Sequence, residues 1–199
     1  MKKKLNSELL LYPCPTILVT SAYQGIENVL AVSWAGIASS HPEHVTISLK
    51  KTRYSYGLIV SSGFFGLNVI NDQQIKFLDY CGTISGRDKN KFVDCQFKKI
   101  YSEIAELPFI EDCPVNIGCK IVSVTNLGSH DLIVGAVQEK LVDSSIFDDN
   151  MHSKLKPAVY FRPNYYKLDS HMIGSFGFSI GEATNIFLKQ SEGTDTKKA

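Results

Sequence analysis

The sequence predicts a mainly β protein, an antiparallel β-barrel with a few helices. Seven segments are short apolar runs or alternate apolar with polar residues, which is the pattern of strands. Turn residues, rather than helical patterns, separate most of these segments, and this arrangement favours a barrel over a doubly wound parallel sheet. The predicted strands are residues 16–22, 28–37, 45–50, 64–70, 115–125, 131–142 and 158–168.

The strand at 45–50 has the clearest alternation, because Val45, Ile47 and Leu49 share one face. In the strand at 115–125, apolar residues occupy every second position up to Ile121 and then shift phase to Val122. A slip of one residue in a long strand predicts a β-bulge, which bends a sheet towards closure.

Two helices are predicted between the strands. Asn71 and Gln74 have the spacing of a capping box, which starts a helix with Leu78 on its inner face. A shorter helix is expected after Tyr54, with Ile59 directed inward.

Composition indicates one globular domain. The 199 residues include 44% hydrophobic and 21% charged residues, enough to bury a single core. The formal net charge is only +1, so no broad basic field points to nucleic acid. No segment reaches the length of a membrane span, and we expect neither a nucleic-acid nor a membrane partner.

The cysteines indicate a reducing compartment. They are five in number and form no C-x-x-C pair, so they predict neither a disulfide framework nor a zinc site. The apolar run at 9–11 is too short for a secretory signal, and no glycosylation sequon occurs. The expected location is the cytoplasm.

A basic segment follows the strand at 45–50. Three cations and two hydroxyls lie within six residues, where the strand ends and a helix is expected to begin. The segment is either a solvated corner or a local anion site. It contains Lys50, Lys51, Thr52, Arg53 and Ser55.

The single tryptophan, Trp34, lies between the small residues Ser33 and Ala35. Small neighbours let another group approach the backbone, so this segment is suited to lie under a flat aromatic ligand. The alternative, which the residues alone favour, is a tryptophan packed in the core.

The sequence has no motif typical of metal binding or of nucleotide binding. His41 and His44 lie three residues apart, but Pro42 breaks any helix that would align them, and no third metal ligand is evident. The glycine run at 174–181 has the wrong spacing for a dinucleotide fingerprint, and no P-loop occurs. We therefore expect no metal.

Taken together, five segments resemble the flavin reductase-like proteins with an FMN-binding split β-barrel, flavoredoxin among them. In order, they are YPCPTILVTS, NVLAVSWAGIASSHPEHVTISLKKTRYSYGLIVSSGFFGLNVI, SGRDKNKF, SHDLIVGAV and KPAVYFRPNYYKL. The resemblance spans Tyr12 to Leu168 and implies an antiparallel Greek-key split barrel that binds FMN. The expected organisation is an arm at 1–11, the barrel domain at 12–170 and a partly disordered extension at 171–199.

The resemblance also implies which residues hold FMN. In flavoredoxin-like members, the contacts correspond to Asn28, Trp34, Ser55, Lys91, His130 and Phe161. The chemistry of the basic segment agrees, because a guanidinium, an ammonium and a hydroxyl suit a phosphate at a helix N-terminus. The full set expected to contact the cofactor is Asn28, Ser33, Trp34, Ala35, Ser48, Lys50, Arg53, Ser55, Lys91, His130 and Phe161.

Two positions depart from the pattern of the family. Cys14 stands where many relatives carry a basic or small residue before proline, and Ser55 replaces the commoner threonine.

Three functions are compatible with this resemblance. The first is an NAD(P)H-dependent flavin reductase, in which a nicotinamide transfers hydride to the bound flavin. The second is a flavoredoxin-like electron carrier that receives electrons from a protein donor. The third is a flavin-binding protein without turnover. The resemblance further implies a homodimer with the flavin at the subunit interface.

Overall fold

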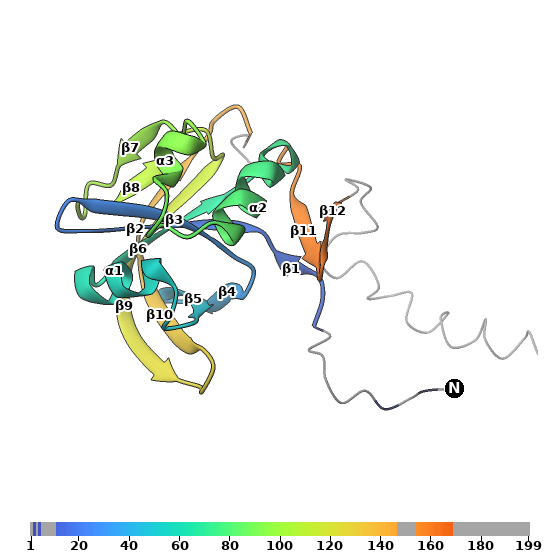
Figure 1. Cartoon of the computed structure of the whole chain (residues 1–199), viewed down its shortest axis with the longest axis horizontal. Coiled ribbons are helices and arrows are strands. Elements are labelled where there is room, and N and C mark those ends of the chain that lie inside the picture. Colours follow the sequence, from blue (N-terminus) through green and yellow to red (C-terminus); the bar gives the residue numbers. More distant parts are fainter. Residues whose placement is uncertain (1, 3, 5–10, 147–153, 169–199) are drawn as a thin grey trace, which may run out of the picture. The chain divides into compact units, whose positions relative to one another are not determined.

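The computed structural model describes residues 2, 4, 11–146 and 154–168 (Figure 1). These residues belong to one compact unit, Met1–Leu168. The expected extension at 171–199 lies outside the described residues, as does the expected arm at 1–11 apart from residues 2, 4 and 11. No helix in the described part of the chain is long and apolar enough to cross a membrane.

A seven-stranded antiparallel sheet forms the main body and confirms the predicted mainly β architecture. Its strand order is β3-β2-β6-β9-β10-β5-β4. The strands are β2 (Ile17–Tyr23), β3 (Ile26–Val32), β4 (Ala35–Ser40), β5 (Glu43–Leu49), β6 (Phe64–Val69), β9 (Val115–Asn126) and β10 (Asp131–Val142).

The sheet curls until its two edges adjoin. The edge strands β3 and β4 are joined by only two residues, Ser33 and Trp34, which we call the link. Because the link is so short, Val32 and Ala35 are at most about 10 Å apart. The backbone N–H of Ser48 in β5 donates to the carbonyl of Trp34 at 2.8 Å, which holds the link against the sheet. The curled sheet encloses a core. Six of the strands and the helix α1 (Tyr54–Ser62) contribute buried residues to it, and Ile47, Phe65 and Ile133 are fully buried.

The predicted strand at 28–37 is therefore wrong in one respect. It is two strands, because the chain leaves one edge of the curled sheet at Val32 and enters the other at Ala35. The predicted strand at 158–168 is likewise a hairpin, β11 (Ala158–Phe161) and β12 (Asn164–Lys167), which turns at Arg162 and Pro163. This hairpin pairs with β1 (Cys14–Pro15) in a separate three-stranded sheet (Figure 1).

The predicted bulge in β9 is confirmed. Ile121 pairs with Gly135 and Ser123 pairs with Val134, which leaves Val122 as the extra residue. The bulge lies where β9 extends past its pairing with β6, so it bends the exposed end of the β9–β10 hairpin.

Both predicted helices are present. The first, α1 (Tyr54–Ser62), buries Ile59 completely against the barrel core. The capping box of Asn71 and Gln74 forms as predicted and starts a 3-10 turn, η1 (Asp72–Gln74), followed by α2 (Ile75–Thr83) with Leu78 buried.

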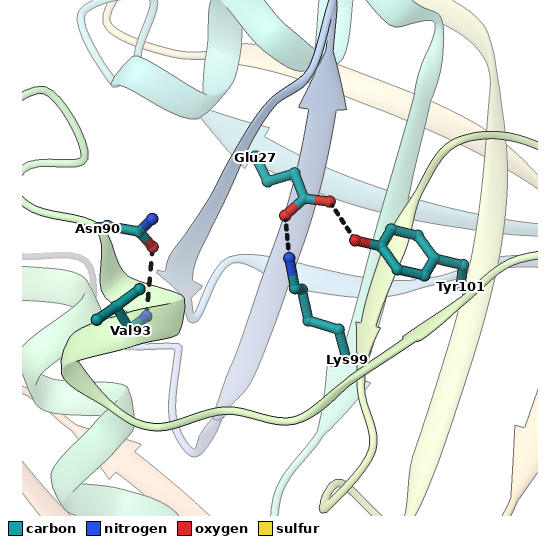
Figure 2. A network of polar contacts seen from close by, with 5 residues as sticks. All are labelled: Glu27, Asn90, Val93, Lys99 and Tyr101. Atoms are coloured by element: carbon teal, nitrogen blue, oxygen red, sulfur yellow. Dashed lines mark hydrogen bonds and ion pairs between the residues drawn. The ribbon is translucent and has the colours of Figure 1, made fainter.

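A second core lies on the other face of β2 and β3, where α2 packs with elements that the sequence did not predict. These are α3 (Lys91–Asp94), β7 (Lys99–Tyr101) and β8 (Pro108–Ile110). Figure 2 shows how Glu27 of β3 secures this layer: Oε2 accepts from Lys99 Nζ at 2.7 Å, and Oε1 accepts from the Tyr101 hydroxyl at 2.9 Å.

Candidate functional site

The basic segment forms the turn between β5 and α1. The backbone N–H of Arg53 donates to the carbonyl of Lys50 at 3.0 Å, and that of Tyr56 donates to the carbonyl of Arg53 at 3.0 Å. Arg53 is the N-cap of α1, and its side chain makes no capping hydrogen bond. The start of α1 therefore offers backbone donors and the positive end of the helix dipole at the same place as the cations.

Only part of this positive charge is neutralised within the described residues. The Lys51 ammonium lies 3.6 Å from Oδ2 of Asp131, a carboxylate that is almost fully buried. The same oxygen accepts from the Tyr56 hydroxyl at 2.6 Å, and this hydrogen bond raises the pKa of Tyr56. Lys50 and Arg53 form no ion pair with any described carboxylate, so both cations are free to meet an external anion.

These two cations line a pocket of about 160 Å³ at the place where the edges of the sheet adjoin. Described carboxylates contribute nothing to its wall, so the pocket is suited to an anion. The lining residues are Leu30, Ala31, Val32, Ser33, Trp34, Ser48, Leu49, Lys50, Arg53 and His130.

His130, in the turn between β9 and β10, closes this pocket beside Trp34. The two ring centroids are 4.5 Å apart with the planes inclined at 41°. Burial lowers the pKa of His130, and the positive charges of Lys50 and Arg53 lower it further. These surroundings favour the neutral imidazole, while a bound anion would favour its charged form.

Trp34 is not a core residue. Its side chain is 45% exposed, because it lies on the link between the two edge strands rather than inside the barrel. The reading of Trp34 as part of the core, which the residues alone favoured, is wrong. A large aromatic surface left half open beside an anion pocket is suited to a ligand that is both planar and charged.

Asn28 and Ser55 meet behind the pocket. Both side chains are buried, and Asn28 Nδ2 donates to Ser55 Oγ at 2.8 Å. Because Ser55 belongs to the first turn of α1 and Asn28 to β3, this bond fixes the helix start against the sheet. Gly86 packs closely on the pair, since a Cβ at this position would lie 2.2 Å from Asn28 Oδ1.

Lys91 is also buried, with a side chain only 2% exposed. Its ammonium donates to the carbonyl of Val29 at 2.8 Å and to that of Cys81 at 2.7 Å, which ties β3 to α2. Burial lowers the pKa of Lys91. Two of the three ammonium donors are used by these carbonyls, and Lys91 is absent from the pocket lining.

The helix that carries Lys91 is capped by Asn90. Figure 2 shows Asn90 Oδ1 accepting from the backbone N–H of Val93, at 3.3 Å. This cap orients the four-residue helix α3, and the loop before it reaches the basic turn through Arg87. The Arg87 guanidinium donates to the carbonyl of Thr52 at 3.3 Å and lies 5.5 Å from the centre of the Tyr54 ring.

A larger, mostly apolar cavity of about 560 Å³ also adjoins the link. It shares Ser33 and Trp34 with the anion pocket, so the link borders both a polar space and an apolar one. Its remaining walls come from Ala35, from the sheet that contains β1 and β11, and from the segment 11–13 before β1. The lining residues are Leu11, Tyr12, Pro13, Cys14, Pro15, Ser33, Trp34, Ala35, Tyr160 and Arg162.

Phe161 does not line either space. Its ring stacks on Tyr12, with centroids 5.2 Å apart, so it supports the wall of the apolar cavity from behind. Cys14 does line this cavity, and its thiol donates to the carbonyl of Leu11 at 3.3 Å.

The structure thus separates the expected cofactor residues into three groups. Those at the anion pocket are Ser33, Trp34, Ser48, Lys50, Arg53 and His130. Ala35 lines the apolar cavity. Asn28, Ser55, Lys91 and Phe161 lie behind these walls and position them.

Arg87 was not among the residues expected at the site. The sequence shows only a polar loop at this position, and no periodicity indicates that the loop folds back over the basic turn. The loop motif S-G-R-D-K-N-K-F, with Arg87 beside the expected Lys91, was the available signal.

Comparison with known proteins agrees with this architecture. Residues 9–169 match the family model described as flavin reductase like domain. The flavoredoxin of Desulfovibrio vulgaris is 27% identical, and its structure superposes with a TM-score of 0.81 over 88% of this chain and 98% of that one.

Two further proteins extend the comparison. A flavin reductase of Pseudomonas putida is 29% identical over 134 residues, which are 67% of this chain and 75% of that protein. The flavoredoxin of Methanosarcina acetivorans is 22% identical with a TM-score of 0.83, over 91% of this chain and 98% of that one, and shows the same fold. The family match, which covers most of the chain and includes every element that builds the two pockets, shows that this chain belongs to the flavin reductase-like domain family.

Proposed function

We propose that the chain binds FMN, with the phosphate at the basic turn and the ring beside Trp34. The observation that carries the proposal is that two different spaces share the Ser33–Trp34 link. One is a small space with the free cations Lys50 and Arg53, and the other is a larger apolar space.

The residues present fit each part of this cofactor. A phosphate carries nearly two negative charges, and a guanidinium can bind two of its oxygens while an ammonium and the start of α1 add further attraction. A planar and largely apolar ring fits against the exposed indole of Trp34. Ser33 and Trp34 line both spaces, so they would contact the part of the cofactor that joins the phosphate to the ring.

We further propose that the protein is an NAD(P)H-dependent flavin reductase. Bound FMN supplies the hydride-accepting chemistry, which needs no acid or base from the protein. The contribution of the chain is to anchor the phosphate through Lys50 and Arg53 and to orient the ring on Trp34. It also keeps the site rigid through the buried contacts of Asn28 and Lys91.

The flavin reductase of Pseudomonas putida, with its identity of 29%, supports this assignment. The similarity to the Desulfovibrio flavoredoxin, which this chain covers over 98% of its length, favours the second candidate, an electron carrier. The two candidates differ in whether a nicotinamide or a protein donates the electrons. A flavin-binding role without turnover is the third candidate.

An anaerobic visible spectrum of the purified, FMN-loaded protein tests these candidates. Bleaching of the flavin absorbance by NADH or NADPH is the result expected of a reductase. A stable yellow protein that only a protein donor reduces would identify a carrier. The absence of any flavin spectrum after reconstitution with FMN would contradict both.

We also propose a homodimer with the flavin at the interface. Exposed apolar side chains on β4 and β9 support this assembly: Ile37 is 87% exposed and Val122 is 58% exposed. Burial of such large apolar side chains would contribute to the stability of a dimer. Sedimentation should give twice the mass of the chain, and a strict monomer with full FMN affinity would contradict the proposal.

A further inference from the structure

The 560 Å³ cavity has two walls of different origin. One wall is the link and the first residue of β4, which belong to the barrel. The other wall comes from the separate sheet and the segment before it, with Tyr12, Tyr160 and Arg162. Under the proposed function the flavin ring lies on the first wall, because the link also borders the phosphate pocket. The second wall is therefore available to another molecule.

This second wall is aromatic, and its rings are held in place by neighbouring rings. Tyr12 stacks on Phe161 at a centroid distance of 5.2 Å, and Tyr160 packs against Tyr165 at 5.1 Å. Proline and leucine side chains complete the wall. A preformed surface of tyrosine and proline suits a flat aromatic ligand, and the cavity volume lies within the roughly 300–1,000 Å³ of small-molecule sites.

Arg162 supplies the only full charge on the cavity wall among the described residues. It forms no hydrogen bond or ion pair with any other described side chain, and it is exposed in the turn between β11 and β12. A guanidinium presents a planar fork of donors that matches a carboxylate. No described carboxylate on the wall competes for it.

We propose that this cavity binds planar aromatic carboxylates beside the flavin, with Arg162 as the residue that selects the anion. The proposal rests on the proposed function only for the position of the flavin. The aromatic wall accounts for the preference for flat molecules, and the single cation accounts for the preference for an acid over its neutral analogue.

Benzoate and benzamide are the probes that test this assignment, because they have nearly the same shape and differ in charge. The FMN-loaded full chain is titrated with each compound, and binding is followed by calorimetry and by the visible flavin spectrum. We expect benzoate to bind about tenfold more tightly than benzamide, the gain of one charge-assisted contact. In Arg162→Gln this preference should disappear while the affinity for FMN stays unchanged.

Two further variants control the measurement. Lys120→Gln removes an exposed cation of β9 that does not line the cavity, and it should keep the benzoate preference. Arg162→Lys keeps the charge but not the fork, and it should keep only part of the preference.

Equal binding of the two probes to the wild-type chain would overturn the proposal, as would a benzoate preference that survives in Arg162→Gln. Loss of FMN affinity in a folded Arg162→Gln would overturn it too, because Arg162 would then belong to the flavin site. Failure of the wild-type chain to take up FMN would contradict the proposed function instead. In that case, calorimetry of the flavin-free chain still decides whether the cavity prefers benzoate.

Discussion

The ammonium of Lys51 lies 3.6 Å from the carboxylate of Asp131, which is buried at the start of β10. Three cations follow one another closely in the basic turn, yet this ion pair uses only one of them within the described residues. The charge left for a ligand therefore belongs to Lys50 and Arg53. Lys51, which is already paired, can serve as the control when either of these two residues is replaced.

Replacing Arg53 by Ala should weaken FMN binding about ten- to a hundredfold. A charge-assisted hydrogen bond contributes roughly 1.5–3 kcal/mol, and about 1.4 kcal/mol corresponds to a tenfold change in affinity. Fluorescence or calorimetric titration measures the loss. Riboflavin, which lacks the phosphate, should bind the variant and the wild-type chain with the same affinity.

Lys51→Ala is the control for that experiment. Its ammonium is committed to Asp131, so we expect a much smaller effect on FMN binding than in Arg53→Ala. Equal losses of FMN and riboflavin affinity in a folded Arg53→Ala would contradict the phosphate assignment. They would move the anion site to the loop with Arg87.

The fluorescence of Trp34 should be strongly quenched when FMN binds. Its indole is 45% exposed at the junction of the two pockets, so the free protein should emit as a partly solvated tryptophan. As the single tryptophan of the chain, Trp34 gives an unambiguous signal. An emission spectrum that does not change across a complete titration would place the flavin elsewhere.

Gly86→Ala should destabilise the fold by about 1–3 kcal/mol, the range for forced overpacking of a close contact. The new Cβ would lie 2.2 Å from Asn28 Oδ1, so the Asn28 side chain would have to leave its hydrogen bond to Ser55. Urea unfolding measures the change in the free energy of unfolding.

A double-mutant cycle with Asn28→Ala shows whether this contact is the cause. In the Asn28→Ala background, the Gly86→Ala substitution should cost less than about 1 kcal/mol, because the side chain that obstructs the methyl group is gone. The same cost in both backgrounds would show that Gly86 is needed for another reason, such as the conformation of its loop.

His130 should make stability and FMN binding depend on pH in opposite ways. Burial, then Lys50 and Arg53, lower the pKa of His130 in the folded protein below its ordinary value of 6.5. The neutral ring is therefore favoured by folding. This contribution to stability is fully present above pH 6.5 and is lost as the pH falls through the lower folded pKa.

A bound phosphate should raise the pKa of His130, because it counters the two cations. NMR titration of the imidazole signals with and without FMN measures both values, and His130→Gln identifies the resonance. A pKa that FMN leaves unchanged would place the phosphate away from His130.

Much of the barrel could be predicted from the sequence, because its strands alternate and its turns are polar. The bulge at Val122 and the capping box at Asn71 were both predicted, since each is a local pattern with a local cause. The division between β3 and β4 could not be predicted in this way. Neither glycine nor proline marks it, and it exists only because the curled sheet brings its edges together.

The location of the anion pocket could be predicted from the sequence. Which of its cations remain free for a ligand could not. Charge and spacing located Lys50 and Arg53, whereas the pairing of Lys51 with a carboxylate eighty residues later depends on tertiary structure. The sequence also could not predict that Lys91 is buried and donates to two backbone carbonyls, because a lysine in a polar loop is usually solvated. The turn at Pro163 was a local signal that was missed, as was the loop motif that contains Arg87.

The two-residue connection between β3 and β4 makes the wall of the ligand site and the seam of the barrel the same piece of backbone. If the seam opens, it uncovers two strand edges, and uncovered edges pair readily with other chains. Under the proposed function, FMN bound across Ser33 and Trp34 should therefore stabilise the closed seam. We expect the flavin-free protein to open at the seam more readily, and therefore to aggregate more readily, than the FMN-loaded protein.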